Sequence, residues 1–327
     1  MSETKKEDLM TTSSSFVDGT KGELIYRGYD IRDLGPNATF EEVIYLLWND
    51  KLPNGNELNR FKAALESKRA LPDPLLIIMR DFPWEAHPMA VLRTAVSAMG
   101  LLDRNADNIT PDAAREKALL LTAILPTLVA AWERLRNGRD PIPPRQGLGQ
   151  AANFLYMLDG KDPNPDAVAA LDSYLVLLAD HGFNASTFSA RVTTSTGTDV
   201  YSAITSAIGT LKGPAHGGAT QRAMEQFIDA AQRGDVEQWF NDARESGKRI
   251  MGIGHRIYKV EDPRARILRP LAQKLAESSG TGKWFDIARE IEQLARKDDY
   301  FIERDLYANV DYYSAVVLYT IGLPVDT

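Results

Sequence analysis

Three of the four histidines of this chain lie in segments that suit acid–base chemistry. His181 stands between an aspartate and a glycine, His216 precedes two glycines, and His255 follows the sequence Gly-Ile-Gly. Glycines beside a histidine let the backbone approach a ligand and leave the imidazole accessible as a hydrogen-bond donor or acid–base group. A structural hydrogen bond within a loop is the alternative for each histidine taken alone. His87 precedes Pro88 at the start of an apolar helix, so we expect it to cap or pack that helix outside the site.

The segment around His255 is strongly cationic. Residues 248–269 carry seven cations and only two carboxylates, although the formal net charge of the chain is −7. This local excess favours a small polyanionic ligand over a nucleic acid, which would need a basic face overall. A solvated, cationic helix end is the alternative for the segment alone. The cations are Lys248, Arg249, Arg256, Lys259, Arg264, Arg266 and Arg269, and the carboxylates are Glu261 and Asp262.

Several common kinds of site lack support in the sequence. The absence of cysteine excludes disulfides, thiolate nucleophiles and cysteine-bound metals. The Gly-Ile-Gly before His255 lacks the third glycine and the preceding strand of a dinucleotide fold, and Gly282-Lys283 lacks the earlier glycine of a phosphate-binding loop. No serine stands in a nucleophile elbow. The histidines never lie three or four residues apart, so we expect no metal site.

Helical periodicity dominates the chain, whereas strand-like alternation is confined to residues 24–31. Because no strands alternate with helices, as a parallel sheet would require, the predicted fold class is all-α. The apolar run 118–132 is too short to span a bilayer and contains Pro126, so it predicts a kinked core helix. Predicted helices cover residues 40–48, 57–67, 89–102, 112–135, 165–179, 200–211, 219–233, 236–246, 263–278, 284–296 and 312–321.

Length and composition are those of a soluble globular protein with one or two domains. A chain of 327 residues with 44% hydrophobic content can bury a large core. The first fifteen residues are polar, with no visible signal or anchor, so we expect a flexible tail to about residue 12. The lack of cysteine is compatible with a reducing compartment, and we expect a cytoplasmic location without nucleic-acid or membrane partners.

Together, three segments resemble the active-site blocks of the citrate synthase family: LKGPAHGG at 211–218, GIGHRIYKVEDPR at 252–264 and NVDYYS at 309–314. Residues 17–29 and 180–187 also resemble family blocks, so the resemblance runs from about residue 17 to residue 327 in the expected order. It implies an all-helical, two-domain homodimer or larger homo-oligomer with the active site in a cleft. The expected large domain covers 1–205 and 311–327, and the smaller inserted domain covers 206–310 and closes after oxaloacetate binds.

The resemblance also implies a reaction of the tricarboxylic acid cycle, in which acetyl-CoA condenses with oxaloacetate and citryl-CoA is hydrolysed to citrate and CoA. Removing a methyl proton beside a thioester requires a base and a donor to the carbonyl oxygen. By this match, Asp311 is the base and His216 the donor. His255 would polarise and protonate the keto oxygen of oxaloacetate. Arg264 would bind a carboxylate of oxaloacetate in forked geometry, with His181 as a further donor.

For coenzyme A, the resemblance implies a co-substrate and no permanently bound cofactor. The backbone of Gly252, Ile253 and Gly254 is expected to approach the adenine, and Arg256 or Lys259 to meet the phosphates. A solvated surface is again the alternative for these cations.

Two further expectations concern the C-terminal part. Asp311 precedes the predicted apolar helix 312–321 and therefore suits a helix N-cap, a role that can coexist with catalysis. Members of the family continue beyond the position of Thr327 into another helix and a tail with substrate-binding arginines. Either the given sequence omits this segment of the large domain, which we expect, or the protein lacks part of its oxaloacetate clamp and is weakly active or inactive.

Two alternatives stay open at this point. A 2-methylcitrate synthase, which uses propionyl-CoA, shares these motifs, and an extra methylene changes transition-state binding by only about 1–3 kcal/mol. The other alternative is a non-catalytic helical dimer that binds coenzyme A esters or serves assembly. Such a protein would have no need for His216, His255 and Asp311 together.

Overall fold

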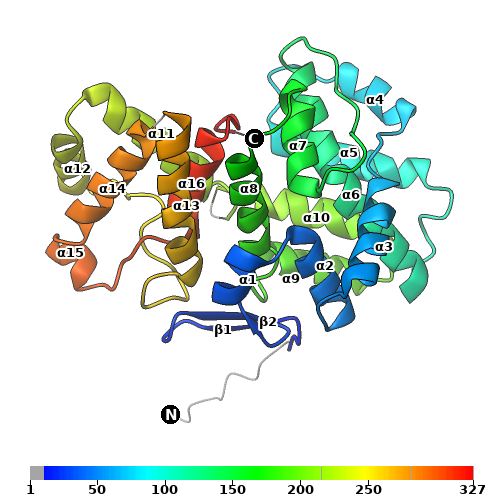
Figure 1. The fold of residues 1–327 in the computed structure, drawn as a ribbon, viewed down its shortest axis with the longest axis horizontal. Helices are drawn as coiled ribbons and strands as arrows, with labels where there is room; N and C mark the ends of the chain where they lie inside the picture. The colour runs from blue at the N-terminus through cyan, green and yellow to red at the C-terminus, as the bar shows by residue number, and fades with distance from the viewer. Residues whose placement is uncertain (1–10, 215, 281, 327) are drawn as a thin grey trace.

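The computed structural model describes residues 11–214, 216–280 and 282–326, and this part of the chain is almost wholly helical (Figure 1). The predicted all-α class is confirmed. The flexible tail predicted up to about residue 12 falls mainly outside the described residues. In chain order the elements are β1 (Ser15–Asp18), β2 (Glu23–Tyr26), β3 (Tyr29–Asp30), α1 (Ile31–Asn37), α2 (Phe40–Asn49), α3 (Gly55–Glu66), α4 (Asp73–Arg80), α5 (Pro88–Leu102), α6 (Pro111–Leu135), α7 (Gln150–Asp159), α8 (Pro165–Leu177), α9 (Ala185–Thr194), α10 (Val200–Leu211), α11 (Ala219–Arg233), α12 (Val236–Glu245), α13 (Pro263–Ser279), α14 (Lys283–Ala295), α15 (Asp299–Ile302) and α16 (Val310–Thr320).

A small antiparallel sheet near the N-terminus joins β1, β2 and β3 in sequence order. Ser15 lies opposite Tyr26 in the β1–β2 hairpin. The strand-like piece predicted at 24–31 contains most of β2 and all of β3, but its end is wrong, because Ile31 is the first residue of α1. The side chain of Asp30 accepts a hydrogen bond from the backbone N–H of Arg32, and this cap starts a helix where alternation suggested a strand.

All eleven predicted helices are present, with ends within two residues of the prediction. Local caps explain this agreement. Thr39 and Glu42 form a capping box at α2, and Asn54 and Glu57 form another at α3. The sequence analysis missed α1, α4, α7, α9 and α15. These helices are short, and half of the ten residues of α9 are serine or threonine, which are weak helix formers.

Helix α6 is longer than the apolar run that predicted it. With 25 residues it is long and apolar enough to cross a membrane, so the statement that this stretch is too short was wrong. However, 56% of its most apolar window is buried inside the protein, in contact with neighbouring helices. Ile124 and Trp132 share a core with residues of α5 and α10. The predicted core helix is therefore confirmed, and the kink at Pro126 stays a prediction.

The arrangement places the N-termini of α13 and α16 near the middle of the molecule. Figure 1 shows α11, α12, α14 and α15 at one end and α2 to α7 at the other, with α8, α13 and α16 between them. The largest apolar core runs from Leu24 and Tyr26 of the hairpin to Tyr312 and Val316 of α16. The domain boundaries at residues 206 and 310 stay a prediction.

Candidate active site

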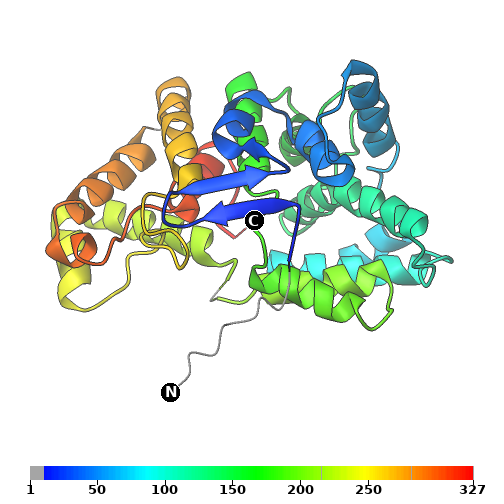
Figure 2. The same cartoon turned by 90° about the horizontal axis from the view of Figure 1, so that it is seen from below.

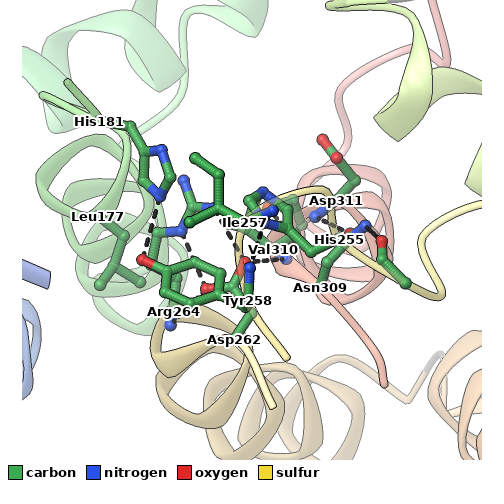
Figure 3. A network of polar contacts seen from close by, with 12 residues as sticks. Leu177, His181, His255, Ile257, Tyr258, Asp262, Arg264, Asn309, Val310 and Asp311 are labelled. Atoms are coloured by element: carbon green, nitrogen blue, oxygen red, sulfur yellow. Dashed lines mark hydrogen bonds and ion pairs between the residues drawn. The ribbon is translucent and has the colours of Figure 1, made fainter. Parts of the chain in front are cut away.

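Three segments distant in sequence, at residues 181, 255–264 and 311, meet at this central position (Figure 3). His181 comes from the loop after α8, and His255 and Tyr258 come from the loop between α12 and α13. Arg264 lies in the first turn of α13, and Asp311 in the first turn of α16. The His181 and His255 rings are 5.7 Å apart between centroids. The structure therefore brings four predicted site residues into one neighbourhood.

Tyr258 links the two histidines, and the sequence analysis missed it. Its hydroxyl lies 3.0 Å from Nε2 of His181. Its ring centroid is 4.9 Å from that of His255. Tyr258 is buried, and burial raises the pKa of its phenol, so the hydroxyl keeps its proton at neutral pH. Its place inside the His255 motif was the only available signal.

The backbone fixes the tautomer of His255. The N–H groups of Ile257 and Tyr258 both donate to Nδ1 of His255, each at 3.1 Å. Burial lowers the pKa of His255, so the ring is neutral near pH 7. Because Nδ1 accepts two hydrogen bonds, the single proton belongs on Nε2. His255 therefore presents a neutral N–H donor on the side away from its own loop.

His181 is also neutral. Burial lowers its pKa to about 3, and the nearby Arg264 guanidinium adds to this effect. A neutral imidazole has one donor and one acceptor nitrogen, and Nε2 is engaged with Tyr258. Both histidines can therefore contact an anion without carrying a charge, while Arg264 supplies the cation.

Arg264 is held by a buried carboxylate that the sequence analysis did not place in the site. Asp262 accepts from Nε of Arg264 at 3.0 Å and from Nη2 at 2.9 Å. Asp262 also accepts at 3.0 Å from the backbone N–H of Val310, the first residue of α16. Only 6% of the Arg264 side chain and 1% of the Asp262 side chain are exposed. The pair therefore joins the starts of α13 and α16, and Nη1 of Arg264 lies outside it.

Asp311 is not a helix N-cap. That position belongs to Asn309, whose side chain accepts from the backbone N–H of Asp311 at 2.9 Å. The amide nitrogen of Asn309 also donates to the carbonyl oxygen of Gly254 at 2.7 Å. The Asp311 carboxylate instead accepts a 2.7 Å hydrogen bond from the hydroxyl of Thr220, near the start of α11. The prediction failed because the cap lies two residues earlier, leaving the carboxylate to face another helix.

His216 contacts a different segment from this cluster, at the start of α9. Its Nε2 accepts from the backbone N–H of Ser186 at 3.3 Å and lies 3.0 Å from the Ser186 hydroxyl, at the start of α9. Among the described residues, no hydrogen bond or ring contact joins it to His255 or Asp311. The connection is indirect, because the segment after His216 leads into α11 and Thr220, which contacts Asp311.

The predicted coenzyme A residues differ in accessibility. Arg256 and Lys259 are exposed, whereas Gly252, Ile253 and Gly254 are buried. Gly252 has a φ of +79°, and a Cβ there would lie 2.8 Å from Cα of Tyr312. Its carbonyl accepts from the N–H of Asn309, and the N–H of Gly254 donates to the carbonyl of Tyr307. In this structure the glycines thus hold the segment before α16.

Other site types find little support in the described part of the chain. No group of three or more His, Asp or Glu residues there is placed to hold a metal ion. A pocket of about 420 Å³ lies beside α5, α6 and α10, lined by residues such as Lys117 and Tyr201. It includes none of the predicted site residues.

Comparison with known proteins identifies the family. The family described as "Citrate synthase, C-terminal domain" matches residues 5–327. The citrate synthase of Haloferax volcanii is 46% identical over 95% of this chain and 82% of its own length. Citrate synthase 2 of Bacillus subtilis is 43% identical over 98% of this chain and 85% of its own. The chain belongs to the citrate synthase family.

Solved structures of this family agree with the fold. Citrate synthase from Pyrobaculum aerophilum gives a TM-score of 0.89 at 38% identity, over 98% of this chain and 82% of that one. A citrate synthase from Thermoplasma acidophilum, in ternary complex with carboxymethyl coenzyme A and oxaloacetate, gives a TM-score of 0.91 at 33% identity. The match covers 98% of this chain and 84% of that one. Citrate synthases are transferases that condense acetyl-CoA with oxaloacetate, and acetyl-CoA is a substrate of the family rather than a bound cofactor.

Proposed function

We propose that this chain is a citrate synthase whose oxaloacetate site is formed by His181, His255 and Arg264. The observation that carries the residue assignment is the fixed tautomer of His255 beside a buried guanidinium. A neutral Nε2–H donor suits the keto oxygen of oxaloacetate, and a cation suits its carboxylates. Nη1 of Arg264 lies outside the pair with Asp262 and is the group we assign to the substrate carboxylate.

His255 is proposed to polarise the keto group and to donate its Nε2 proton as the new carbon–carbon bond forms. A buried donor stabilises developing oxyanion charge more strongly than a solvated donor, because the local dielectric is low. His181 supports the same anion, with its orientation set by Tyr258. The pKa shifts of both rings keep them neutral at physiological pH, so Arg264 supplies the positive charge.

Asp311 is proposed as the base that removes the methyl proton of acetyl-CoA, and His216 as the donor to the thioester oxygen. Thr220 and Asn309 hold Asp311 from two sides. His216 belongs to residues 206–310 and contacts Ser186 of residues 1–205 in this structure, so the assembled site requires His216 to leave Ser186. We therefore propose that residues 206–310 act as a domain that closes against residues 1–205 and excludes water once both substrates are bound.

Coenzyme A is proposed to lie over the loop that follows His255. Arg256 and Lys259 are exposed there and suit its phosphates. Gly252, Ile253 and Gly254 are buried with several backbone groups already paired, so we assign them the smaller task of shaping the loop beside the adenine.

We further propose a cytoplasmic homodimer that pairs through α5, α9 and α10. Helix α9 has no buried residue, yet it carries Phe188 at 47% and Val192 at 49% exposure. Leu101 near the end of α5 is 89% exposed. Helix α10 packs against both α5 and α9, and exposed apolar side chains on such neighbouring helices favour a second copy of the chain over nucleic acid or a membrane.

The test is release of free coenzyme A by the purified chain with oxaloacetate and acetyl-CoA, then with propionyl-CoA. We expect oxaloacetate-dependent release that is lower with propionyl-CoA and falls at least 10²-fold in His255→Ala, His216→Ala and Asp311→Asn. His87→Ala is the matched control, because His87 caps α5 outside the site. Equal activity of the site variants and the control would refute the residue assignment, and a faster reaction with propionyl-CoA would reassign the substrate.

A further inference from the structure

The β1–β2 hairpin touches both histidine loops of the site. Figure 2 shows it lying across the middle of the molecule, with its turn beside the yellow segment that precedes α13. The other end of the hairpin lies against the loop that follows α8. Its two ends thus contact segments that are far apart in sequence and that carry His181 and His255.

The open end of the hairpin holds the His181 loop. Ser15 donates from its hydroxyl to the Asp180 carboxylate and accepts from the backbone N–H of Gly182 at 3.2 Å. Tyr26, paired with Ser15 across the hairpin, accepts from the backbone N–H of Asp180 at 3.2 Å and donates to the last carbonyl of α8. Both neighbours of His181 are therefore bonded to the hairpin.

The turn of the hairpin holds the His255 loop. The carbonyl of Gly19 accepts from the N–H of Lys259 at 2.9 Å. A Cβ at Gly19 would lie inside contact distance of the Ile257 carbonyl oxygen and 2.9 Å from Cγ2 of Ile257. At Gly22, a Cβ would lie 2.8 Å from Cγ2 of Val260. Gly19 does not have a positive φ, so close approach alone accounts for a glycine there.

We propose that this hairpin is a positioning element that sets the distance between the two histidines and the tautomer of His255. Ile257 lies against Gly19, and its N–H is one of the two donors to Nδ1 of His255. A displacement at the turn is therefore passed to the imidazole through one hydrogen bond. The tautomer claim stands on the structure alone, and only its catalytic consequence rests on the proposed citrate synthase reaction.

The first test compares Gly19→Ala with Gly55→Ala. Both replace a glycine without positive φ, but a Cβ at Gly55 meets nothing within 4 Å. Since a misplacement of about 1 Å can cost 10²-fold in rate, we expect kcat/KM for oxaloacetate to fall about 10–100-fold in Gly19→Ala and less than twofold in Gly55→Ala. Activity within twofold of the parent in both variants would overturn the proposal.

The second test reads the tautomer directly by ¹⁵N NMR of labelled histidine at pH 7. We expect a Nδ1-acceptor, Nε2–H signature for His255 in the parent and in Gly55→Ala, and a mixture in Gly19→Ala. An unchanged His255 spectrum in a folded Gly19→Ala protein overturns the proposal, whatever the activity. If the parent proves inactive as a citrate synthase, the spectrum still decides the positioning role, so the two failures are distinguishable.

Ser15→Ala and Ser15→Thr keep the proposal testable if Gly19→Ala does not fold. Ser15→Ala adds no clash and removes the two hydrogen bonds to the His181 loop. We expect KM for oxaloacetate to rise about 3–10-fold with a smaller change in kcat, since loss of these two hydrogen bonds loosens the loop that holds His181. Ser15→Thr restores the hydroxyl and is expected to restore KM. An equal rise of KM in both variants, or no rise in either, would overturn the role of this end of the hairpin.

Discussion

Replacing Asp262 by asparagine tests whether this carboxylate locks the starts of α13 and α16 together. Asp262 accepts four hydrogen bonds, three from Arg264 and one from Val310, and each of its oxygens takes two of them. Asparagine keeps one acceptor oxygen and turns an NH₂ group toward two donors. Loss of one partner of a buried ion pair costs about 3–5 kcal/mol, so we expect a loss of that size in the free energy of unfolding.

The assay is urea unfolding at a fixed protein concentration, with Asp286→Asn as the control. Asp286 pairs with Arg289 at 2.9 Å, but the two side chains are 63% and 53% exposed. An exposed pair of this kind contributes less than about 1 kcal/mol. A loss in Asp262→Asn no larger than in Asp286→Asn would refute the reasoning.

The difference in the free energy of unfolding between the parent and Asp262→Asn should depend on pH through the pKa of Asp262. Burial alone would raise that pKa, but the Arg264 guanidinium and its hydrogen bonds outweigh burial and hold it below the ordinary 3.8. A carboxyl with a lowered pKa adds stability above its unfolded pKa and loses it as the pH falls through the folded pKa. The difference between the parent and Asp262→Asn should therefore be constant from pH 8 to 5 and shrink only below about pH 4.

Two further substitutions probe other parts of the molecule. Burial raises the pKa of Asp172 to about 6, so its ionised form costs stability above that pH, and this cost fades toward pH 4. Asp172→Asn keeps an acceptor for the N–H of Phe40. It should raise the free energy of unfolding by about 1–3 kcal/mol at pH 8 and leave it unchanged near pH 4. A gain in stability that does not depend on pH would contradict the assignment to Asp172 ionisation. Thr220→Val should lower kcat for coenzyme A release about tenfold, because it removes the hydrogen bond to Asp311. Thr220→Ser keeps the hydroxyl, and its kcat should stay within about threefold of the parent value. Equal losses of kcat in the two variants would contradict the role of this hydrogen bond.

The helices were largely predictable from the sequence because their signals are local. A cap such as Thr39 with Glu42 lies within one turn, and an apolar stripe repeats within a few turns. Helix α9 escaped prediction because half of its ten residues are serine or threonine, which are weak helix formers. Residue Ile31 was assigned to a strand because alternation continues through it, although the Asp30 side chain starts a helix there.

The site was only partly predictable. The sequence indicated His181, His255, Arg264 and Asp311 through the resemblance, and the structure gathers them at the starts of two helices. The sequence did not reveal which group each side chain would meet. Asn309 rather than Asp311 caps α16, and Asp262 engages the guanidinium that the sequence assigned to the substrate.

The sequence by itself determined the all-α class, most helix boundaries and the family, because composition, caps and ordered motifs are properties of short segments and their spacing. Only the tertiary structure decided the state of the site. The neutral charge of His181 and the tautomer of His255 depend on burial and on backbone N–H groups supplied by a folded loop. The contacts from the hairpin join residues more than 150 positions apart, a distance over which no local pattern carries information.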